Sequence, residues 1–197
     1  TRGGDDSVLR GVVRFFEGHG FRVLGAGDVA PDLLPPRGQL ARAVPSPEQD
    51  AAVRRAASLI AALGPFDIGQ GVVATADGIV AVEGVRGTDA MLRDLAPGGV
   101  ADGRARGGVL VKLAKPGQEL RIDLPTIGPE TVRGAVAGGL AGMAVGAGAA
   151  IVLERAQLVE RADAAGLFVE GIVPPVVEAT PAPEASPLDI VGRRAPT

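Results

Sequence analysis

The sequence predicts an α/β fold with a mixed sheet flanked by helices. Short apolar runs alternate with segments whose apolar residues recur at helical spacing. Asp77-Gly78 separates two of these runs, which is a strong signal for a β-hairpin. The length of 197 residues allows a substantial hydrophobic core. We expect one domain over residues 1–172 and, because six prolines fall in the last twenty-five residues, a Pro-rich tail over 173–197.

The first part of the chain predicts two helices and one strand. Residues 5–18 have apolar side chains at helical spacing and are followed by glycines, so we expect a helix there. Residues 21–24 favour a strand, and the prolines within 31–45 favour an extended loop. Ser46-Pro47-Glu48 is typical of an N-cap, a first helical proline and a first-turn acid, so a second helix begins here and ends at Gly64-Pro65.

The rest of the chain predicts a hairpin followed by alternating strands and helices. The hairpin pairs residues 71–76 with residues 79–83, and Thr88 is the expected cap of a short helix over 89–95. Further strands are expected over 108–113, 120–124, 143–145, 151–153 and 167–169, and further helices over 128–140 and 155–165.

Composition excludes several classes of function. The absence of cysteine excludes disulfides, cysteine zinc sites and thiol nucleophiles. A net charge of -3, with five Phe and no Tyr or Trp, argues against nucleic acid as a partner. Residues 134–153 carry no charge, but thirteen of the twenty are Gly or Ala, so we expect no membrane span there. Residues 1–6 lack the apolar core of a signal peptide, so we expect a cytoplasmic protein.

Familiar catalytic motifs are absent from the sequence. It contains no phosphate loop, no His-Glu-x-x-His and no Gly-x-Ser-x-Gly, and Gly142, Gly146 and Gly148 do not complete a dinucleotide fingerprint. The single histidine, His19, follows a predicted helix end, where its charge suits the helix dipole better than catalysis. Proton or metal chemistry therefore falls to carboxylates, lysines, hydroxyls and backbone amides.

Two glycine-containing segments, residues 66–89 and 112–129, concentrate such groups. Alternation along a strand over 120–124 would point Leu120 and Ile122 to the core and Arg121 and Asp123 to the opposite side. Cations, a carboxylate and the following helix N-terminus suit a phosphate and a divalent ion. The same groups also suit a solvated salt bridge and ordinary helix caps. The pattern does not choose between this structural interpretation and a site for phosphate and a divalent ion.

These segments also carry a resemblance to a known family. The motifs are Asp67-Ile-Gly-Gln-Gly71, Glu83-Gly-Val-Arg-Gly-Thr-Asp-Ala-Met-Leu92, Arg121-Ile-Asp-Leu-Pro-Thr-Ile-Gly128 and Ala165-Gly-Leu-Phe-Val169. Their order and spacing resemble the C-terminal region of the UDP-2,3-diacylglucosamine pyrophosphatases of lipid A biosynthesis. The resemblance extends from Gly3 to about Ile172, and the Pro-rich tail falls outside it.

The resemblance implies a hydrolase that cleaves the phosphoanhydride of UDP-2,3-diacylglucosamine with a divalent metal, for which we expect Mg²⁺. The products would be UMP and 2,3-diacylglucosamine 1-phosphate. By motif position, Asp123 corresponds to an aspartate that is taken to be critical for catalysis in that family. Our candidates for substrate binding are Gln70, Thr88, Asp89, Lys115, Arg121 and Thr126, and those for metal binding are Asp123 and Asp89.

The family also has an N-terminal domain ahead of the position of Thr1, which this sequence lacks, so half of a site between domains would be missing. The alternative function is therefore a noncatalytic domain for nucleotide-sugar binding or assembly. The expected partners are the nucleotide-lipid substrate and the N-terminal domain, with a homodimer left open. Because the acyl chains of the substrate would enter a bilayer, we expect at most a transient, peripheral contact with the inner leaflet.

Overall fold

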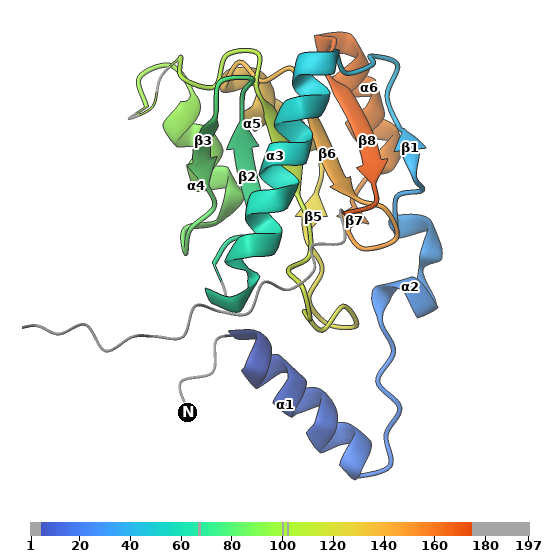
Figure 1. Ribbon diagram of the computed structural model, residues 1–197. Coiled ribbons are helices and arrows are strands. Elements are labelled where there is room, and N and C mark those ends of the chain that lie inside the picture. The colour runs from blue at the N-terminus through green and yellow to red at the C-terminus, as the bar shows by residue number, and fades with distance from the viewer. Residues whose placement is uncertain (1–4, 67, 100, 102, 175–197) are drawn as a thin grey trace, which may run out of the picture.

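Six strands form the central sheet in the order β1-β8-β6-β4-β2-β3 (Figure 1). The computed structural model describes residues 5–66, 68–99, 101 and 103–174. The strands are β1 (Gly38–Gln39), β2 (Gly71–Ala74), β3 (Ile79–Val82), β4 (Val109–Lys112), β6 (Gly142–Gly146) and β8 (Phe168–Ile172). Strands β4, β6 and β8 are parallel, whereas β2 is antiparallel to β3 and β4 and β1 is antiparallel to β8. The predicted mixed α/β sheet is confirmed.

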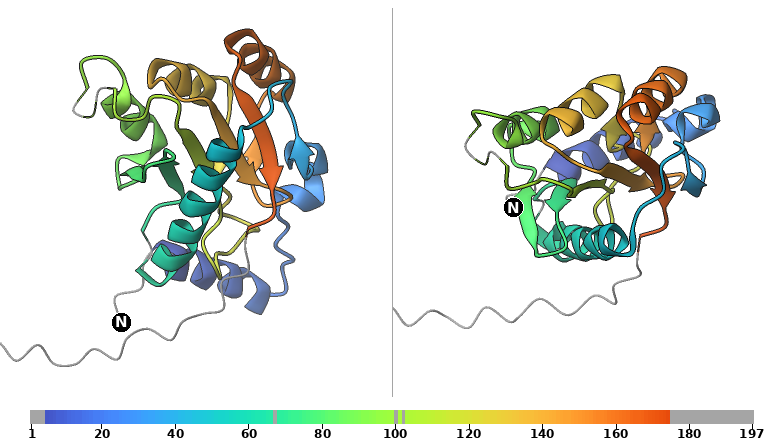
Figure 2. Two further views of the ribbon diagram at one scale, coloured as in Figure 1. Left: turned by 45° about the horizontal axis from the view of Figure 1, so that its top comes forward. Right: turned by 90° about the horizontal axis from the view of Figure 1, so that it is seen from above.

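Helices cover both faces of this sheet. Figure 2 shows α3 on one face and α4, α5 and α6 on the other. The helices are α1 (Asp5–Gly18), α2 (Ala26–Val29), α3 (Pro47–Leu63), α4 (Gly87–Leu95), α5 (Pro129–Ala137) and α6 (Arg155–Ala165), with short 3-10 turns over Pro31–Leu33 and Gly64–Phe66. A second, two-stranded parallel sheet joins β5 (Thr126–Ile127) to β7 (Ile151–Val152). Helix α1 lies apart from the layers, at the lower end of the molecule in Figure 1.

The central strands are buried on both faces, which explains their continuous apolar sequences. In β4, Leu110 packs with the core under α4, α5 and α6, while its neighbours Val109 and Val111 pack with the core under α3. Successive residues of a strand point to opposite faces, so each strand contributes to both cores. Gly142 is required in this packing because a Cβ there would lie 2.2 Å from the Phe168 ring.

Local signals fixed the best-predicted elements. The Ser46 hydroxyl accepts a hydrogen bond from the Gln49 N–H (3.3 Å), and the Gln49 side chain accepts one from the Ser46 N–H (2.8 Å), so α3 begins with the expected N-cap. The hairpin of β2 and β3 is confirmed, although the strands stop at Ala74 and the connection takes in residues 75–78. Within the described residues, no helix has the length and apolar character required to span a bilayer.

Four expectations about local structure are wrong, and three of them concern residues 21–24, Thr88 and Leu153. Residues 21–24 form no strand because they belong to the link between α1 and α2, where no strand lies beside them to pair with. Thr88 does not cap α4: it lies inside the helix, and its hydroxyl bonds to side chains of neighbouring elements. Leu153, expected in a buried strand, follows β7 and is exposed.

The expected strand over residues 120–124 is a turn. The Glu119 carbonyl accepts hydrogen bonds from the N–H groups of Ile122 (3.2 Å) and Asp123 (3.0 Å), a pattern that an extended chain cannot make. Leu120 and Ile122 are therefore 41% and 39% exposed instead of pointing into the core. The alternation that placed Arg121 and Asp123 on a common face is also wrong.

A prediction concerns Glu170, which lies in β8 and is opposite Gln39 of β1. Burial, and then the charge of Asp50, raises the pKa of Glu170. A raised carboxyl pKa favours folding below the unfolded pKa, and this contribution is lost as pH rises through the folded pKa. We expect Glu170→Gln to raise the Tm by roughly 1–3 °C at pH 7 and to have little effect at pH 4.

The measurement is a pair of thermal melts at the two pH values. Glu160→Gln is the matched control, because Glu160 is an exposed glutamate on α6, and it should leave the Tm unchanged at both. An equal stabilisation by Glu170→Gln at pH 4 and pH 7 would show that burial of the charge is not the cause.

Candidate active site

Asp123 lies in the loop between β4 and β5, where two glutamine side chains hold its carboxylate. Gln70, just ahead of β2, donates a hydrogen bond from Nε2 to Asp123 Oδ2 (3.1 Å). Gln118 donates from its own Nε2 to the same oxygen (2.7 Å). Both donors are uncharged amides, so they orient the carboxylate without neutralising its charge. The pairing of Gln70 with Asp123 joins residues 53 positions apart.

Gln118 is held as firmly as the carboxylate that it contacts. Its side chain is buried, its Oε1 accepts a hydrogen bond from the backbone N–H of Lys115 (2.9 Å), and its Nε2 also donates to the backbone carbonyl of Asp123 (3.0 Å). These contacts close residues 115–123 into a loop and prevent the amide from turning over. Gln118 is thus a positioning residue for Asp123.

The two oxygens of Asp123 differ in their surroundings. Both glutamine amides bond to Oδ2, and within the described residues no hydrogen bond reaches Oδ1. The side chain is half-buried, so one carboxylate oxygen is fixed by the protein and the other is available to a water molecule or a cation. This asymmetry is the main chemical feature of the site.

A buried network of Glu83, Thr88 and Lys112 lies at the ends of β3 and β4. Lys112 Nζ donates to Thr88 Oγ1 (2.6 Å) and lies 3.7 Å from Glu83 Oε2, and the Thr88 hydroxyl donates to Glu83 Oε1 (2.8 Å). The side chains of Lys112 and Glu83 are 8% and 15% exposed. Glu83 Oε2 is buried and accepts no hydrogen bond, so the nearby Lys112 ammonium is the group that balances its negative charge.

The start of β2 connects this network to Asp123. Gly71 directly follows Gln70, and a Cβ at Gly71 would lie 2.5 Å from Glu83 Oε2, so a larger residue there would displace the Glu83 carboxylate. The Gln70 carbonyl accepts the N–H of Leu113, the residue after Lys112 (2.9 Å). The carboxylate and the buried network therefore lie on adjacent strand ends, at the carboxyl end of β4, where open α/β sheets commonly bind ligands.

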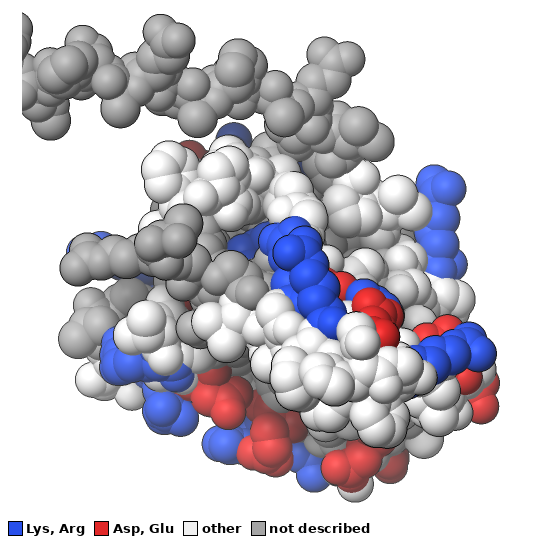
Figure 3. Space-filling view, turned by 90° about the horizontal axis from the view of Figure 1, so that it is seen from below, with Lys and Arg blue, Asp and Glu red and all other residues white. Residues whose placement is uncertain are grey.

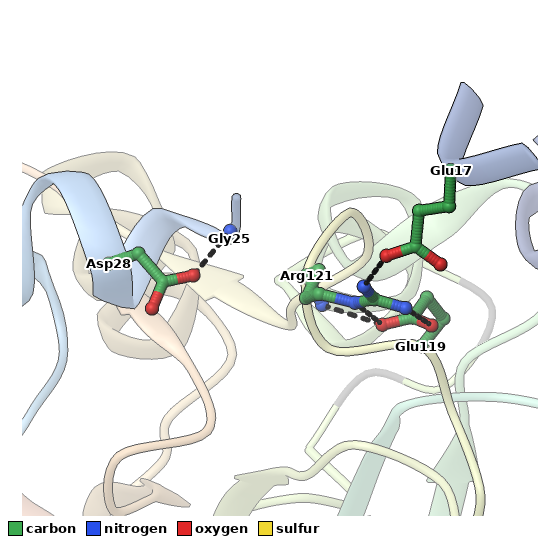
Figure 4. A network of polar contacts seen from close by, with 5 residues as sticks. All are labelled: Glu17, Gly25, Asp28, Glu119 and Arg121. Atoms are coloured by element: carbon green, nitrogen blue, oxygen red, sulfur yellow. Dashed lines mark hydrogen bonds and ion pairs between the residues drawn. The ribbon is translucent and has the colours of Figure 1, made fainter. Parts of the chain in front are cut away.

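Arg121 does not join Asp123 but links α1 to the domain (Figure 4). Its guanidinium donates two hydrogen bonds to Glu119 (both 2.8 Å) and one to Glu17 of α1 (2.6 Å). Hydrogen bonding by Arg121 lowers the pKa of Glu119 to about 2, and Glu119 and Glu17 raise the pKa of Arg121. Gly25 packs against the same loop, because its Cβ would lie 3.0 Å from Arg121 Cα.

The remaining sequence candidates fall in several places. Thr126 Oγ1 donates to the Leu124 carbonyl (3.1 Å) in the same loop as Asp123. Lys115 contributes its backbone N–H to Gln118, as described above. Asp89 is exposed and lines a groove between α4 and α5 beside Arg93 and Glu130. No described hydrogen bond or ion pair joins Asp89 to Asp123, and Asp67 lies outside the described residues.

The residues around Asp123 fit a divalent ion that arrives with a phosphate-bearing ligand. Among the residues that the structure describes, no three His, Cys, Asp or Glu side chains gather as a metal cage. Mg²⁺ is usually bound by one or two carboxylates, with phosphate oxygens and water completing its shell. Asp123 Oδ1 would supply one such ligand. Asp89, the second predicted ligand, lines the groove between α4 and α5.

Sequence reasoning missed Glu83, Lys112 and Gln118 as site residues. A lysine closing the apolar strand Val109–Lys112 and a glutamate following the apolar strand Ile79–Val82 are the signals that could have revealed the first two. Gln118 follows a Pro-Gly turn, and its role depends on a fold-back of the chain that has no sequence signature.

The fold and the site define an α/β domain in which a half-buried carboxylate and a buried lysine lie at the ends of adjacent strands. Residues 36–170 match the LpxI C-terminal domain family, and the chain belongs to that family. The chain is also similar to the UDP-2,3-diacylglucosamine pyrophosphatase LpxI of Caulobacter vibrioides, with 45% identity over 178 residues. The aligned part covers 88% of this chain and 63% of that protein, so the chain spans less than two thirds of its relative.

A prediction follows for the buried ion pair. Lys112→Met leaves Glu83 as a buried, uncompensated carboxylate, and we expect it to lower the free energy of unfolding by about 3 kcal/mol. Adding Glu83→Gln removes the stranded charge and should restore at least half of the loss. Urea unfolding of the single and double variants measures both values. A loss below about 1 kcal/mol for Lys112→Met would mean that the pair is effectively solvated.

A second prediction concerns the Arg121 network. Arg121→Ala should raise amide hydrogen exchange in α1 by roughly two- to fivefold at pH 7, since exposed ion pairs contribute under about 1 kcal/mol. Because the pKa of Glu119 is lowered, its contribution is present above the unfolded pKa and is lost as pH falls toward about 2. Arg133→Ala, which breaks an exposed pair with Glu130 on α5, is the control. Faster exchange in the central sheet of Arg121→Ala would contradict a role confined to α1.

Proposed function

We propose that this chain is the carboxylate-bearing part of an enzyme that hydrolyses the phosphoanhydride of UDP-2,3-diacylglucosamine. The products are UMP and 2,3-diacylglucosamine 1-phosphate. Two facts support this reaction: the name of the Caulobacter relative and the asymmetric carboxylate of Asp123. The second fact is the one on which the proposal depends. A divalent metal, for which we favour Mg²⁺, would neutralise phosphate charge when bound at Asp123 Oδ1.

The chemistry requires a water oxygen to attack one phosphorus while the bridging P–O bond breaks. Asp123 Oδ1 would orient the water or hold the metal, and Gln70 and Gln118, which bond to Oδ2, keep Oδ1 directed into the site. The bridging oxygen leaves on the second phosphate, and the proton of the attacking water passes to bulk solvent or to a phosphate oxygen. No covalent intermediate with the protein is required.

We assign to Lys112 the role of the cation that contacts the phosphates. The sequence had suggested Lys115 or Arg121 for this role. The Lys112 ammonium has three N–H donors, and one of them donates to Thr88 Oγ1, while Glu83 Oε2 lies 3.7 Å away as an ion pair without a hydrogen bond. A further N–H can donate to a phosphate oxygen. Burial strengthens this interaction because little water screens it. Arg121, by contrast, is occupied by two carboxylates.

The alternative is a noncatalytic domain that binds or assembles around a nucleotide sugar. It is favoured because, in the part of the chain that the structure describes, Asp123 belongs to no group of three or more metal-ligating side chains. Release of UMP from UDP-2,3-diacylglucosamine and Mg²⁺ separates the two functions. The test uses this chain fused to the part of the Caulobacter protein that it does not match. Absence of UMP would support the alternative.

Asp123→Asn in the same fusion tests whether the charge of Asp123 is needed for turnover. An asparagine can place its oxygen at the position of Oδ2 and keep both glutamine hydrogen bonds, so the Tm should change by less than about 2 °C. It removes the charge at Oδ1, and we expect turnover to fall by about two orders of magnitude or more. Normal turnover, or a loss that only follows a large drop in Tm, would remove Asp123 from the mechanism.

A further inference from the structure

An apolar groove lies on the α3 side of the sheet and shares a wall with the Asp123 site. One side is formed by Ala57, Ile60 and Ala61 of α3, and the other by the loop that follows β4, including Leu113, Pro116 and Leu120. Its volume is about 350 Å³, within the usual range for small-molecule sites. Two of the three α3 side chains, those of Ala57 and Ala61, are small, which leaves space in the groove.

Two polar side chains line this groove, and both belong to the loop that carries the site. They are Lys115 and Gln118, and Gln118 is the residue that bonds to Asp123 Oδ2. The groove is therefore polar next to the catalytic carboxylate and apolar elsewhere. A ligand with a phosphate-bearing head and a hydrocarbon chain has the same distribution of polarity.

The surroundings distinguish this groove from two others on the molecule. The groove between α4 and α5 is lined by four charged residues, Asp89, Arg93, Glu130 and Arg133. A groove beside β8 also has four, Arg37, Asp50, Arg54 and Glu170. Neither suits a hydrocarbon chain. Figure 3 shows the molecule from below, the end at which α1 lies, and much of that surface carries no charge.

Exposed apolar side chains occur on the loop wall itself. Leu120 is 41% exposed and lines the groove, although its sequence pattern had predicted a core position. The loop is packed tightly at the end of α3, because a Cβ at Gly64 would lie 2.8 Å from Pro116 Cδ. The groove is thus part of the folded loop and not a gap between loosely packed segments.

We propose that this groove binds an acyl chain of the lipid-linked substrate, with Ala61 and Leu120 setting the space available to it. The inference rests on the proposed function, since the acyl chains come from the substrate named for the relative. Burying hydrocarbon against apolar walls gives affinity in proportion to the area removed from water. Gln118 would then connect recognition of the chain to the orientation of Asp123.

The test measures binding of a fluorescent fatty acid, cis-parinaric acid, to this chain and requires no hydrolysis. Ala61→Phe fills the groove from α3 and should weaken binding at least tenfold. Leu120→Asp, at an exposed position that tolerates substitution, places a charge on the opposite wall and should have the same effect. Ala62→Phe is the matched control, because Ala62 is exposed on the same helix and lies outside the groove.

Four outcomes are informative. Loss of binding in Ala61→Phe and Leu120→Asp, with Ala62→Phe unchanged and all variants folded by circular dichroism, supports the groove. Unchanged binding in both groove variants overturns it. Loss of binding in Phe15→Ser, which alters the exposed face of α1, would show that the acyl chain binds α1, and this result would also overturn the groove proposal. A fusion that releases no UMP but still shows groove-dependent binding would reject the proposed hydrolysis and retain the groove.

Discussion

The hydrogen bonds made by the Gln118 side chain are the constraint on which the functional end of the molecule depends. Its amide bonds to the carboxylate and the backbone carbonyl of Asp123 and accepts the Lys115 N–H. Because the amide is buried, losing one of these bonds would leave an unpaired polar group away from water, which costs roughly 1–3 kcal/mol. The same loop carries Arg121, which holds α1, and Leu120, which lines the apolar groove. One side chain thus supports a carboxylate, a helix contact and a groove wall.

The sheet supplies the rigid base for that loop. Strand β4 lies between β6 and β2, and both of its faces are buried, so its carboxyl end is among the least mobile positions in the fold. Lys112 is the last residue of β4 and can be buried there because Glu83, just after β3, compensates its charge and Thr88 of α4 accepts its hydrogen bond. A mobile strand end would let water enter and reduce the effect of this charge.

The sequence predicted elements with local causes and failed where distant contacts decide. Helix α3 and the β2–β3 hairpin have a cap, a proline and a turn dipeptide, and both formed. The alternation of Leu120 and Ile122 imitates a strand, but Glu119 binds the Arg121 side chain and backbone and favours a turn. Asp123 and Gln70 were found through family motifs. Gln118 and Lys112 were missed because burial and partners from other elements, not spacing, give them their roles.

The two cations of this region illustrate why exposure decides their roles. Arg121 is about one third exposed and joins two partly exposed glutamates, so salt and water weaken its interactions, and it is suited to holding α1 in place. Lys112 is buried beside one glutamate and a hydroxyl, and its field is screened far less. Sequence position suggested Lys115 or Arg121 as the phosphate-binding cation, and Arg121 is two residues from Asp123. Burial favours Lys112, which is eleven positions away but lies at a fixed strand end. For the proposed hydrolysis of a pyrophosphate, the rigid and poorly screened charge is the more effective one.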